Sequence, residues 1–114
     1  MSVELNTRKI DGVTVVDVSG RITLGDSAST LRDALRGLVG KGEKKILLNL
    51  GGLTYIDSSG LGVLVSGFAT VANSGGTLKL LNVTGRIKDL LVLTKLYTVF
   101  EVFEEEATGI RSFA

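Results

Sequence analysis

The sequence contains neither histidine nor cysteine, and these two absences narrow its chemistry more than any other feature. Without cysteine the chain can form no disulfide, no thiolate zinc site and no thiol nucleophile. Without histidine it lacks the commonest general base and the commonest metal ligand, and it cannot build a Ser-His-Asp triad. Only carboxylate, hydroxyl, lysine and arginine chemistry is left. We therefore expect no enzymatic activity, no cofactor and no metal site.

An excess of either charge is also missing. Thirteen Lys and Arg residues stand against twelve Asp and Glu residues, which gives a net charge of +1. This balance provides no electrostatic basis for binding nucleic acid or an anionic membrane, so we expect neither as a partner. Aromatic residues make up only 5% of the chain and hydrophobic residues 44%, so the core must be aliphatic. A length of 114 residues predicts one domain over positions 1–114.

Two features of the chain bear on membranes. The N-terminal residues MSVELNTRKI contain no apolar stretch of the kind found in signal peptides. Residues 58–78 carry no charge and are long enough to suggest a membrane span. More than half of them are Gly, Ser, Thr or Asn, however, and this composition favours a buried helix of a soluble fold. We therefore expect a cytoplasmic protein without a membrane-spanning segment.

Hydrophobic periodicity predicts strands that alternate with helices. Two strands with a turn at Asp11-Gly12 form an opening β-hairpin, and the second is rich in β-branched residues. The later elements are a helix within 24–42, a strand at 44–50, a helix up to 73–76, a strand at 77–83, a helix within 84–97, a strand within 98–103 and a short helix within 104–114. This order predicts an α/β fold: a mixed, mostly parallel β-sheet covered by about four helices. On the second helix, the apolar face is expected to contain Leu61, Leu64, Val65, Phe68 and Ala72.

The stretch TYIDSSGLG, residues 54–62, places polar residues where an apolar strand leads into the second helix. We expect Asp57 and Ser58 in the loop, with Ser59 or Gly60 opening the helix. One interpretation is a helix cap, in which a side-chain oxygen accepts a hydrogen bond from a free backbone N–H. One residue would be enough for a cap, and three polar residues followed by glycine exceed that need. The other interpretation is a functional site at the strand end, where α/β folds meet ligands and partners.

A hydroxyl at the start of a helix suits one modification. A phosphate placed there would meet free N–H groups and the positive end of the helix dipole. It would add about two negative charges without unfolding the helix. The same serine could not act as a nucleophile, because no base is available to activate it.

A second stretch of interest, GRITLGDSASTL at residues 20–31, leads into the first helix. Asp26 or Ser27 is expected to cap that helix, with a cap the favoured role for Ser27. In a parallel layout this loop could lie at the same end of the sheet as Ser58. Thr23, Asp26 and Ser27 would then contribute to one polar rim.

These stretches together resemble a known family. GRITLGDSASTLRDAL, the block YIDSSGLG after an apolar strand, and the order Gly-Gly, strand, LLVLTKL and phenylalanine are similar to a STAS domain of the bacterial anti-sigma factor antagonist type. The resemblance covers nearly the whole chain. One departure is Thr23, which stands three residues after Gly20 where many family members have aspartate.

The resemblance implies a partner switch. The unphosphorylated protein would bind an anti-sigma factor that is also a serine kinase, and so release the sigma factor. The kinase would phosphorylate Ser58, with Ser59 as the second candidate, and a phosphatase of the PP2C type would reset the protein. The partner-binding residues implied, together with the polar rim, are Thr23, Asp26, Asp57, Ser58, Ser59, Gly60, Leu61 and Gly62.

Other functions stay open on the sequence alone. The chain could be a STAS-type module that binds a small ligand or a nucleotide, or one that switches a partner other than a sigma regulator. A carboxylate-dependent hydrolase using Asp57 is the enzyme alternative, and it would need tuned carboxylates or lysine in place of histidine. The oligomeric state, monomer or weak dimer, is not determined by the sequence.

Overall fold

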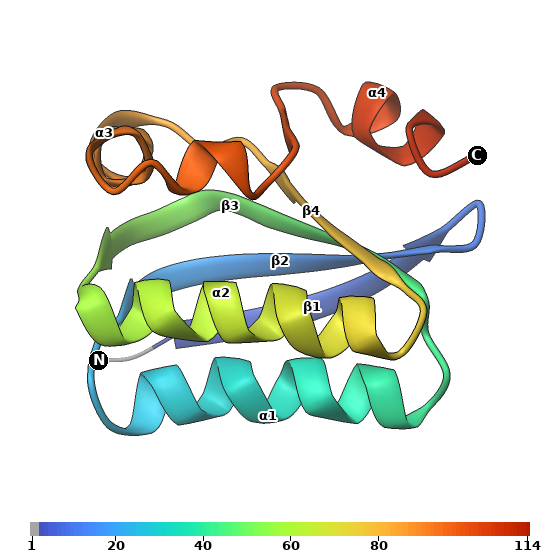
Figure 1. Ribbon diagram of the computed structural model, residues 1–114, viewed down its shortest axis with the longest axis horizontal. Coiled ribbons are helices and arrows are strands. Elements are labelled where there is room, and N and C mark those ends of the chain that lie inside the picture. The colour runs from blue at the N-terminus through green and yellow to red at the C-terminus, as the bar shows by residue number, and fades with distance from the viewer. Residues whose placement is uncertain (1–2) are drawn as a thin grey trace.

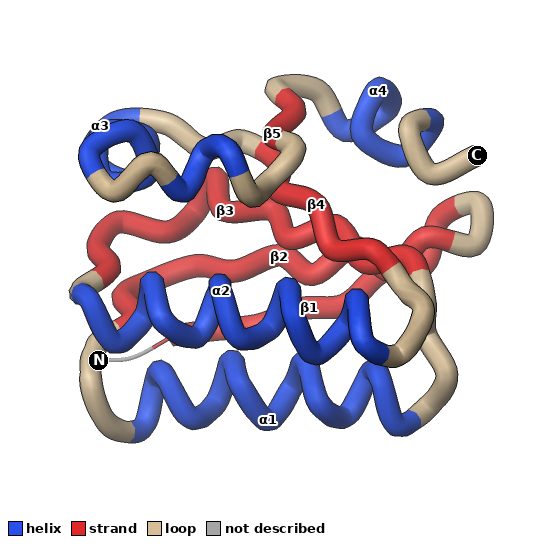
Figure 2. The backbone as a smooth tube through the Cα atoms, viewed as in Figure 1, coloured by secondary structure: helices blue, strands red, loops and turns tan. Residues whose placement is uncertain are grey.

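The computed structural model describes residues 3–114 and contains one five-stranded sheet with helices packed against it (Figures 1 and 2). The strands lie in the order β1-β2-β3-β4-β5; β1 is antiparallel to β2, and the other neighbours are parallel. The elements are β1 (Val3–Ile10), β2 (Val13–Ile22), α1 (Asp26–Gly40), β3 (Lys45–Ile56), α2 (Ser58–Asn73), β4 (Thr77–Leu81), α3 (Gly85–Leu93), the 3-10 helix η1 (Leu96–Thr98), β5 (Val102–Phe103) and α4 (Glu106–Arg111). The predicted mixed sheet, opening hairpin and four helices are confirmed.

The opening hairpin forms where the sequence predicts it. Asp11 and Gly12 both have positive φ angles, 52° and 81°, as a two-residue turn between twisted strands requires. Asp and Gly are among the residues that adopt this left-handed conformation most readily. Ile10 therefore pairs with Val13, and the register of the whole hairpin follows from that pair.

The two faces of the sheet bury two separate apolar clusters. Alternate residues of β3 divide between them, since Ile46 and Leu48 join the larger cluster and Leu47 joins the smaller one. Helices α1 and α2 lie side by side along the sheet (Figure 1), and their buried residues belong to the larger cluster. Helix α4 closes the smaller cluster through Ile110. The buried residues of both clusters are aliphatic except for Phe100 in the larger one, as the scarcity of aromatic residues predicts.

Three elements differ in length from those predicted. Strand β3 continues to Ile56 instead of ending at Gly51 and Gly52, because pairing with β2 resumes at Gly52, opposite Ser19, after a register shift. The third helix ends at Leu93 and gives way to η1 after Lys95, whose φ is 61°. The strand predicted within 98–103 is reduced to two residues, which pair with Leu80 and Leu81 at the end of β4.

A charged cluster ties the hairpin to the last helix. The Arg8 guanidinium donates to Asp17 at 2.7 and 2.9 Å and to Glu106 at 2.6 Å. This bonding holds the pKa of the Asp17 carboxyl below its usual range. Arg8 therefore links β1, β2 and α4 on the face of the sheet opposite α1. Over the described part of the chain, no helix has the length and apolar character needed to cross a membrane.

Candidate functional site

Asp57 is the N-cap of α2. The sequence predicts that Ser59 or Gly60 opens this helix, so the helix starts earlier than predicted. Helix α2 begins at Ser58, so Ser58 is its first residue and does not lie in a loop, and neither Ser59 nor Gly60 opens it. One carboxylate oxygen of Asp57 accepts from the Gly60 backbone N–H at 2.9 Å. Capping at Asp57 satisfies an N–H group that would otherwise be free, and this is why the helix starts directly after the strand.

The second oxygen of Asp57 joins two loops. It accepts from the backbone N–H of Leu24 at 3.0 Å, and the Asp57 N–H donates to the Ile22 carbonyl at 3.1 Å. These bonds hold the β2–α1 loop against the start of α2. The prediction that the two polar stretches lie at the same end of the sheet is confirmed.

Neither Asp26 nor Ser27 caps α1, which corrects the predicted cap. The N-cap position is Gly25, with a φ of 107°, and Asp26 is the first helical residue and is exposed. The Ser27 hydroxyl turns back and bonds the N–H of Thr23 at 2.8 Å and its carbonyl at 3.1 Å. Ser27 is buried, so it fixes the inside of the loop and contributes nothing to a surface rim. Thr23 is half-buried above it, and the outermost side chain of this loop is Leu24, at 80% exposed.

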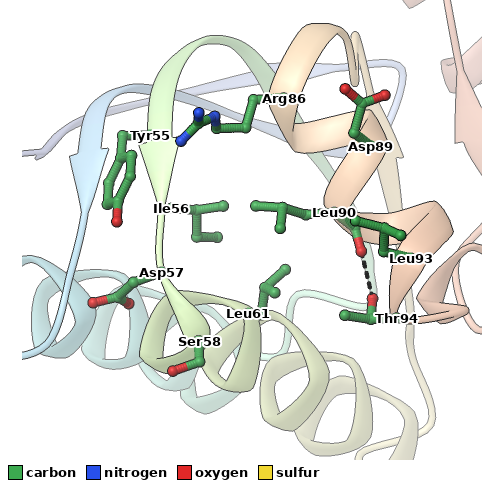
Figure 3. Close-up of a pocket in the computed structure, with 10 residues that line it drawn as sticks. All are labelled: Tyr55, Ile56, Asp57, Ser58, Leu61, Arg86, Asp89, Leu90, Leu93 and Thr94. Atoms are coloured by element: carbon green, nitrogen blue, oxygen red, sulfur yellow. Dashed lines mark hydrogen bonds between the residues drawn. The ribbon is translucent and has the colours of Figure 1, made fainter.

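The two adjacent serines face different grooves. Ser58 is exposed and lies at the edge of a groove of about 600 Å³ between α2 and α3, which we call the α2–α3 groove (Figure 3). Ser59 is half-buried and lines a separate hollow of about 450 Å³ between α1 and α2. Asp57 borders the first groove and reaches Leu24, which borders the second. The acid therefore lies between the two surfaces.

The α2–α3 groove has apolar walls and a charged margin. Leu61 of α2 and Leu90 of α3 point into it, and Ile56 at the end of β3 faces Leu90 (Figure 3). Arg86 and Asp89 of α3 provide the charges. The other lining residues are Tyr55, Asp57, Ser58, Leu93 and Thr94.

Sequence reasoning missed the contribution of α3 to this groove. A signal was present in the run of apolar residues LLVL at 90–93, which is too long for one buried stripe of a short helix. Leu91 takes the buried position, and Leu93 is left 78% exposed beside the groove.

The two glycines of the motif have different environments. Gly60 is buried, and a Cβ placed on it would lie 2.4 Å from Cγ1 of Ile56. Gly62 is exposed and faces open space. Gly60 therefore allows α2 to pack closely on the ends of β2 and β3. Gly62 leaves the exposed surface of α2 without a side chain at that position.

The electrostatics of the site follow from the Asp57 cap. Hydrogen bonds from the Gly60 and Leu24 N–H groups, in that order, lower the pKa of Asp57, so the group is a carboxylate at neutral pH. Among residues 3–114, no group of three or more acidic residues gathers in a geometry suited to a metal ion. The arrangement offers an exposed hydroxyl, a fixed carboxylate and apolar contact surface, which are the means of binding and of accepting a modification.

We expect Asp57→Ala to lower the melting temperature by about 5 °C, because it removes a cap and the tie to Leu24 together. The pKa of Asp57 is depressed in the fold, so its contribution is complete above the ordinary value of 3.8 and is lost as pH falls through the lower folded value. Thermal unfolding from about pH 7 down to about pH 2 should show the variant and wild type converging in acid. Asp26→Ala is the matched control, since Asp26 is exposed and makes no cap bond; an equal loss in both variants would contradict this role.

The chain is similar in sequence and in structure to known proteins of one family. The family model described as STAS domain matches residues 4–109. The anti-sigma-B factor antagonist of Bacillus subtilis is 30% identical over 111 residues, which cover 97% of this chain and 100% of that protein. An anti-sigma factor antagonist from Mycobacterium paratuberculosis has a similar structure, with a TM-score of 0.86 at 21% identity over 97% of this chain and 93% of that one. The Bacillus cell fate determinant SpoIIAA in its phosphorylated form gives a TM-score of 0.76 at 17% identity, covering 97% of this chain and 100% of that one.

Proposed function

The chain belongs to the STAS domain family, and on this premise we propose that it is an anti-sigma factor antagonist that acts by partner switching. In its unphosphorylated form it binds an anti-sigma factor and thereby releases the sigma factor. Phosphorylation of Ser58 ends that binding. The chain acts in the cytoplasm as one domain over residues 1–114 and has no catalytic activity of its own.

The exposed position of Ser58 beside an apolar groove is the observation that supports this proposal most directly. A partner that fills the α2–α3 groove would contact Leu61, Leu90 and Leu93 and would cover the Ser58 hydroxyl. A phosphate on the same hydroxyl would change the charge of this contact surface without disturbing the core. Binding and its control would thus use one surface.

A phosphate on Ser58 would act by charge and not by unfolding. Ser58 is the first residue of α2, where added negative charge is compatible with the helix dipole. The phosphate would lie beside Asp57 and at the edge of an apolar groove, so a bound partner would have to desolvate about two additional charges. Burying an unpaired charge at an interface costs several kcal/mol, on the order of 2–5. That cost is enough to release a partner bound with micromolar affinity.

The kinase and the phosphatase come from outside the chain. We propose that the anti-sigma factor is itself the serine kinase and that a phosphatase of the PP2C type removes the phosphate. The lack of histidine is compatible with this scheme, because the partners perform all the catalysis. On the other side of Asp57 the contact surface continues over Thr23, Leu24, Asp26, Ser59 and Gly62, and Thr23 offers a neutral hydroxyl there.

The direct test is release of the sigma factor from a preformed complex with the cognate anti-sigma factor. Adding the unphosphorylated chain should free the sigma factor in proportion to the amount added, as followed by size-exclusion chromatography. The chain phosphorylated beforehand should free none. Release that is the same in both forms would contradict the switch. If the anti-sigma factor fails to bind and the isolated chain binds ATP, the ligand-binding alternative would replace the proposal.

We expect Leu93→Asp to weaken binding of the anti-sigma factor about tenfold or more, because it places a charge on the apolar wall of the α2–α3 groove. Leu93 is 78% exposed, so the fold should tolerate the change. Val92→Asp is the matched control, since Val92 is 53% exposed on the same helix but does not line the groove. Isothermal titration calorimetry of both variants would separate the two positions. Equal losses in affinity would show that the partner does not use this groove.

A further inference from the structure

The hollow between α1 and α2 carries positive charge without a matching acid. It has a volume of about 450 Å³, and a notch of about 30 Å³ between the same helices shares Arg32, Val63 and Ser66 with it. Arg32 lines both, and Arg36 lines the notch. Over residues 3–114, no carboxylate lines either of them. An anion that enters this surface would therefore meet two cations and no like charge on the walls.

Both guanidinium groups have hydrogen-bond donors to spare. Arg32 is half-buried, and its one hydrogen bond within the described chain goes to the Ser29 hydroxyl at 3.5 Å, which is longer than a normal bond. Arg36 is exposed and forms no ion pair with residues 3–114. A guanidinium carries five donors, and a carboxylate can accept two of them at once. Each arginine can therefore bind a carboxylate without giving up an existing acidic partner.

The acids of α1 do not compensate this charge. Asp26 and Asp33 are exposed and line neither the hollow nor the notch. Neither forms an ion pair in the part of the chain that the structure describes. Asp57, the acid before the two serines, already accepts two backbone hydrogen bonds and lines neither space. The positive charge of Arg32 and Arg36 is therefore available to a partner.

Helix α2 forms the opposite wall and adds no charge of its own. It has no charged residue from Ser58 to Asn73. Its part of the wall includes the hydroxyls of Ser59 and Thr70, which can donate to an anion. A Cβ placed on Gly62 would meet nothing within 4 Å, so this wall leaves room for a side chain to enter. The chemistry of the surface thus suits a segment that carries carboxylates and opposes a basic one.

We propose that this surface binds an acidic segment of the anti-sigma factor, with two carboxylates that pair with Arg32 and Arg36. The inference rests on the proposed function, because it assigns a chemistry to a second contact with the same partner. Ser59 lines the hollow and directly follows Ser58 in α2, so a partner that covers Ser58 lies beside the hollow. Continuity with that contact surface and the charge of the two arginines together select this occupant.

The spacing of the arginines limits how the acids are arranged. Arg32 and Arg36 are four residues apart on α1, which places them on one side of the helix and about 6 Å apart along its axis. Carboxylates at positions i and i+4 of a partner helix have the same spacing. Arg32 is less exposed than Arg36, so its pair should be less screened by salt and should contribute more.

Isothermal titration calorimetry of the full chain with the anti-sigma factor, in low and in high salt, tests the inference. Arg32→Glu should weaken binding about tenfold or more in low salt, because it replaces an attractive pair with a repulsive one, and the loss should shrink in high salt. Arg36→Glu should show a smaller loss in the same direction. Arg32→Gln removes the charge and keeps a polar side chain. It should give an intermediate loss of affinity at an unchanged melting temperature, which separates the effect from misfolding.

Lys41→Glu is the matched control. Lys41 directly follows α1 and is exposed, but it lines neither the hollow nor the notch. The variant makes the same change in net charge as Arg32→Glu and should weaken binding less than about twofold. A partner acid changed to lysine that restores the affinity of Arg32→Glu would identify the opposing carboxylate. Equal losses from Lys41→Glu and Arg32→Glu would reduce the effect to net charge and overturn the inference.

The possible outcomes distinguish this contact from the switch itself. If wild type and Arg32→Glu bind the anti-sigma factor equally, the acidic contact is wrong and the proposed function is unaffected. If wild type binds no anti-sigma factor, both are wrong. If isolated wild type binds ATP or inorganic phosphate and Arg32→Glu does not, the surface is a site for a small anion, and an acidic protein segment is not its occupant.

Discussion

Replacing Ser58 with alanine is expected to abolish phosphorylation of the chain by the anti-sigma factor kinase that we propose as its partner. Wild type and Ser59→Ala should each gain one phosphate, measured by intact-protein mass spectrometry after incubation with the kinase and ATP. The reason is geometric: Ser58 is exposed at the mouth of the α2–α3 groove, whereas Ser59 is half-buried and faces the hollow beside α1. A kinase docked on the groove would reach the first hydroxyl and not the second.

Glutamate at position 58 mimics the charge of a phosphoserine, so its effect on binding can be measured without the kinase. Ser58→Glu should weaken binding to the anti-sigma factor by about a hundredfold, because it buries an unpaired carboxylate in the interface. Ser59→Glu should have a much smaller effect, since its side chain enters the other hollow. Calorimetry with each purified variant measures both affinities. Phosphate found on Ser58→Ala, or equal losses from the two glutamates, would transfer the acceptor role to Ser59 or remove it from this motif.

The order of elements could be predicted because it depends on local signals. Asp11-Gly12 forms its turn through backbone conformations that those two residues adopt easily, and the short apolar strands could be placed by composition. Lengths could not be predicted where tertiary pairing overrides the local signal. Gly51 and Gly52 resemble a strand end in the sequence, yet β3 passes through them and pairs again with β2. A Cβ at Gly52 would lie 2.8 Å from that of Ser19 on the neighbouring strand, so this pairing requires glycine there.

Hydrophobic periodicity predicted that α2 is a helix, but it did not predict which of its residues are buried. The expected face included Val65 and Ala72, but both are exposed, and the buried residues are Gly60, Val63, Leu64, Gly67 and Val71. Two of these are glycines, which carry no hydrophobic signal. A Cβ on Gly67 would lie 2.5 Å from a methyl group of Leu35, so the close approach of α1 and α2 selects the smallest residue.

At the site, the polar residues could be found from the sequence and their partners could not. Asp57 and Ser58 stand out because three polar residues and a glycine follow an apolar strand, which is more than one helix cap needs. The bond from Leu24 to Asp57 spans 33 positions and depends on Ile22 and Ile56 being paired in adjacent strands. Leu93 and Arg86 line the groove because α3 lies across it from α2, and the apolar run at 90–93 indicates an extra apolar surface but not which element it faces.

Gly60→Ala and Gly62→Ala are expected to change the free energy of unfolding in opposite directions. The two substitutions are chemically identical and lie two residues apart in the first turns of α2. At Gly60 the new Cβ would meet Ile56 at 2.4 Å and Ile22 at 2.8 Å, so α2 must move or the two isoleucines must leave their rotamers. Overpacking of this kind costs about 1–3 kcal/mol, a large part of the stability of a small domain. At Gly62 the Cβ meets nothing within 4 Å, and alanine should stabilise the helix by about 0.5–1 kcal/mol.

Urea denaturation measures both changes as shifts in midpoint at an unchanged slope. The Gly60 variant carries a further consequence, because moving the start of α2 would strain the bonds from Asp57 to Gly60 and Leu24. It should therefore be phosphorylated more slowly even where it is fully folded, whereas Gly62→Ala leaves the bonds of Asp57 undisturbed. Destabilisation of similar size in both variants would mean that α2 is limited by helix formation and not by its fit against β2 and β3. A stable Gly60→Ala with normal phosphorylation would show that the Asp57 cap holds Ser58 in place without this close packing.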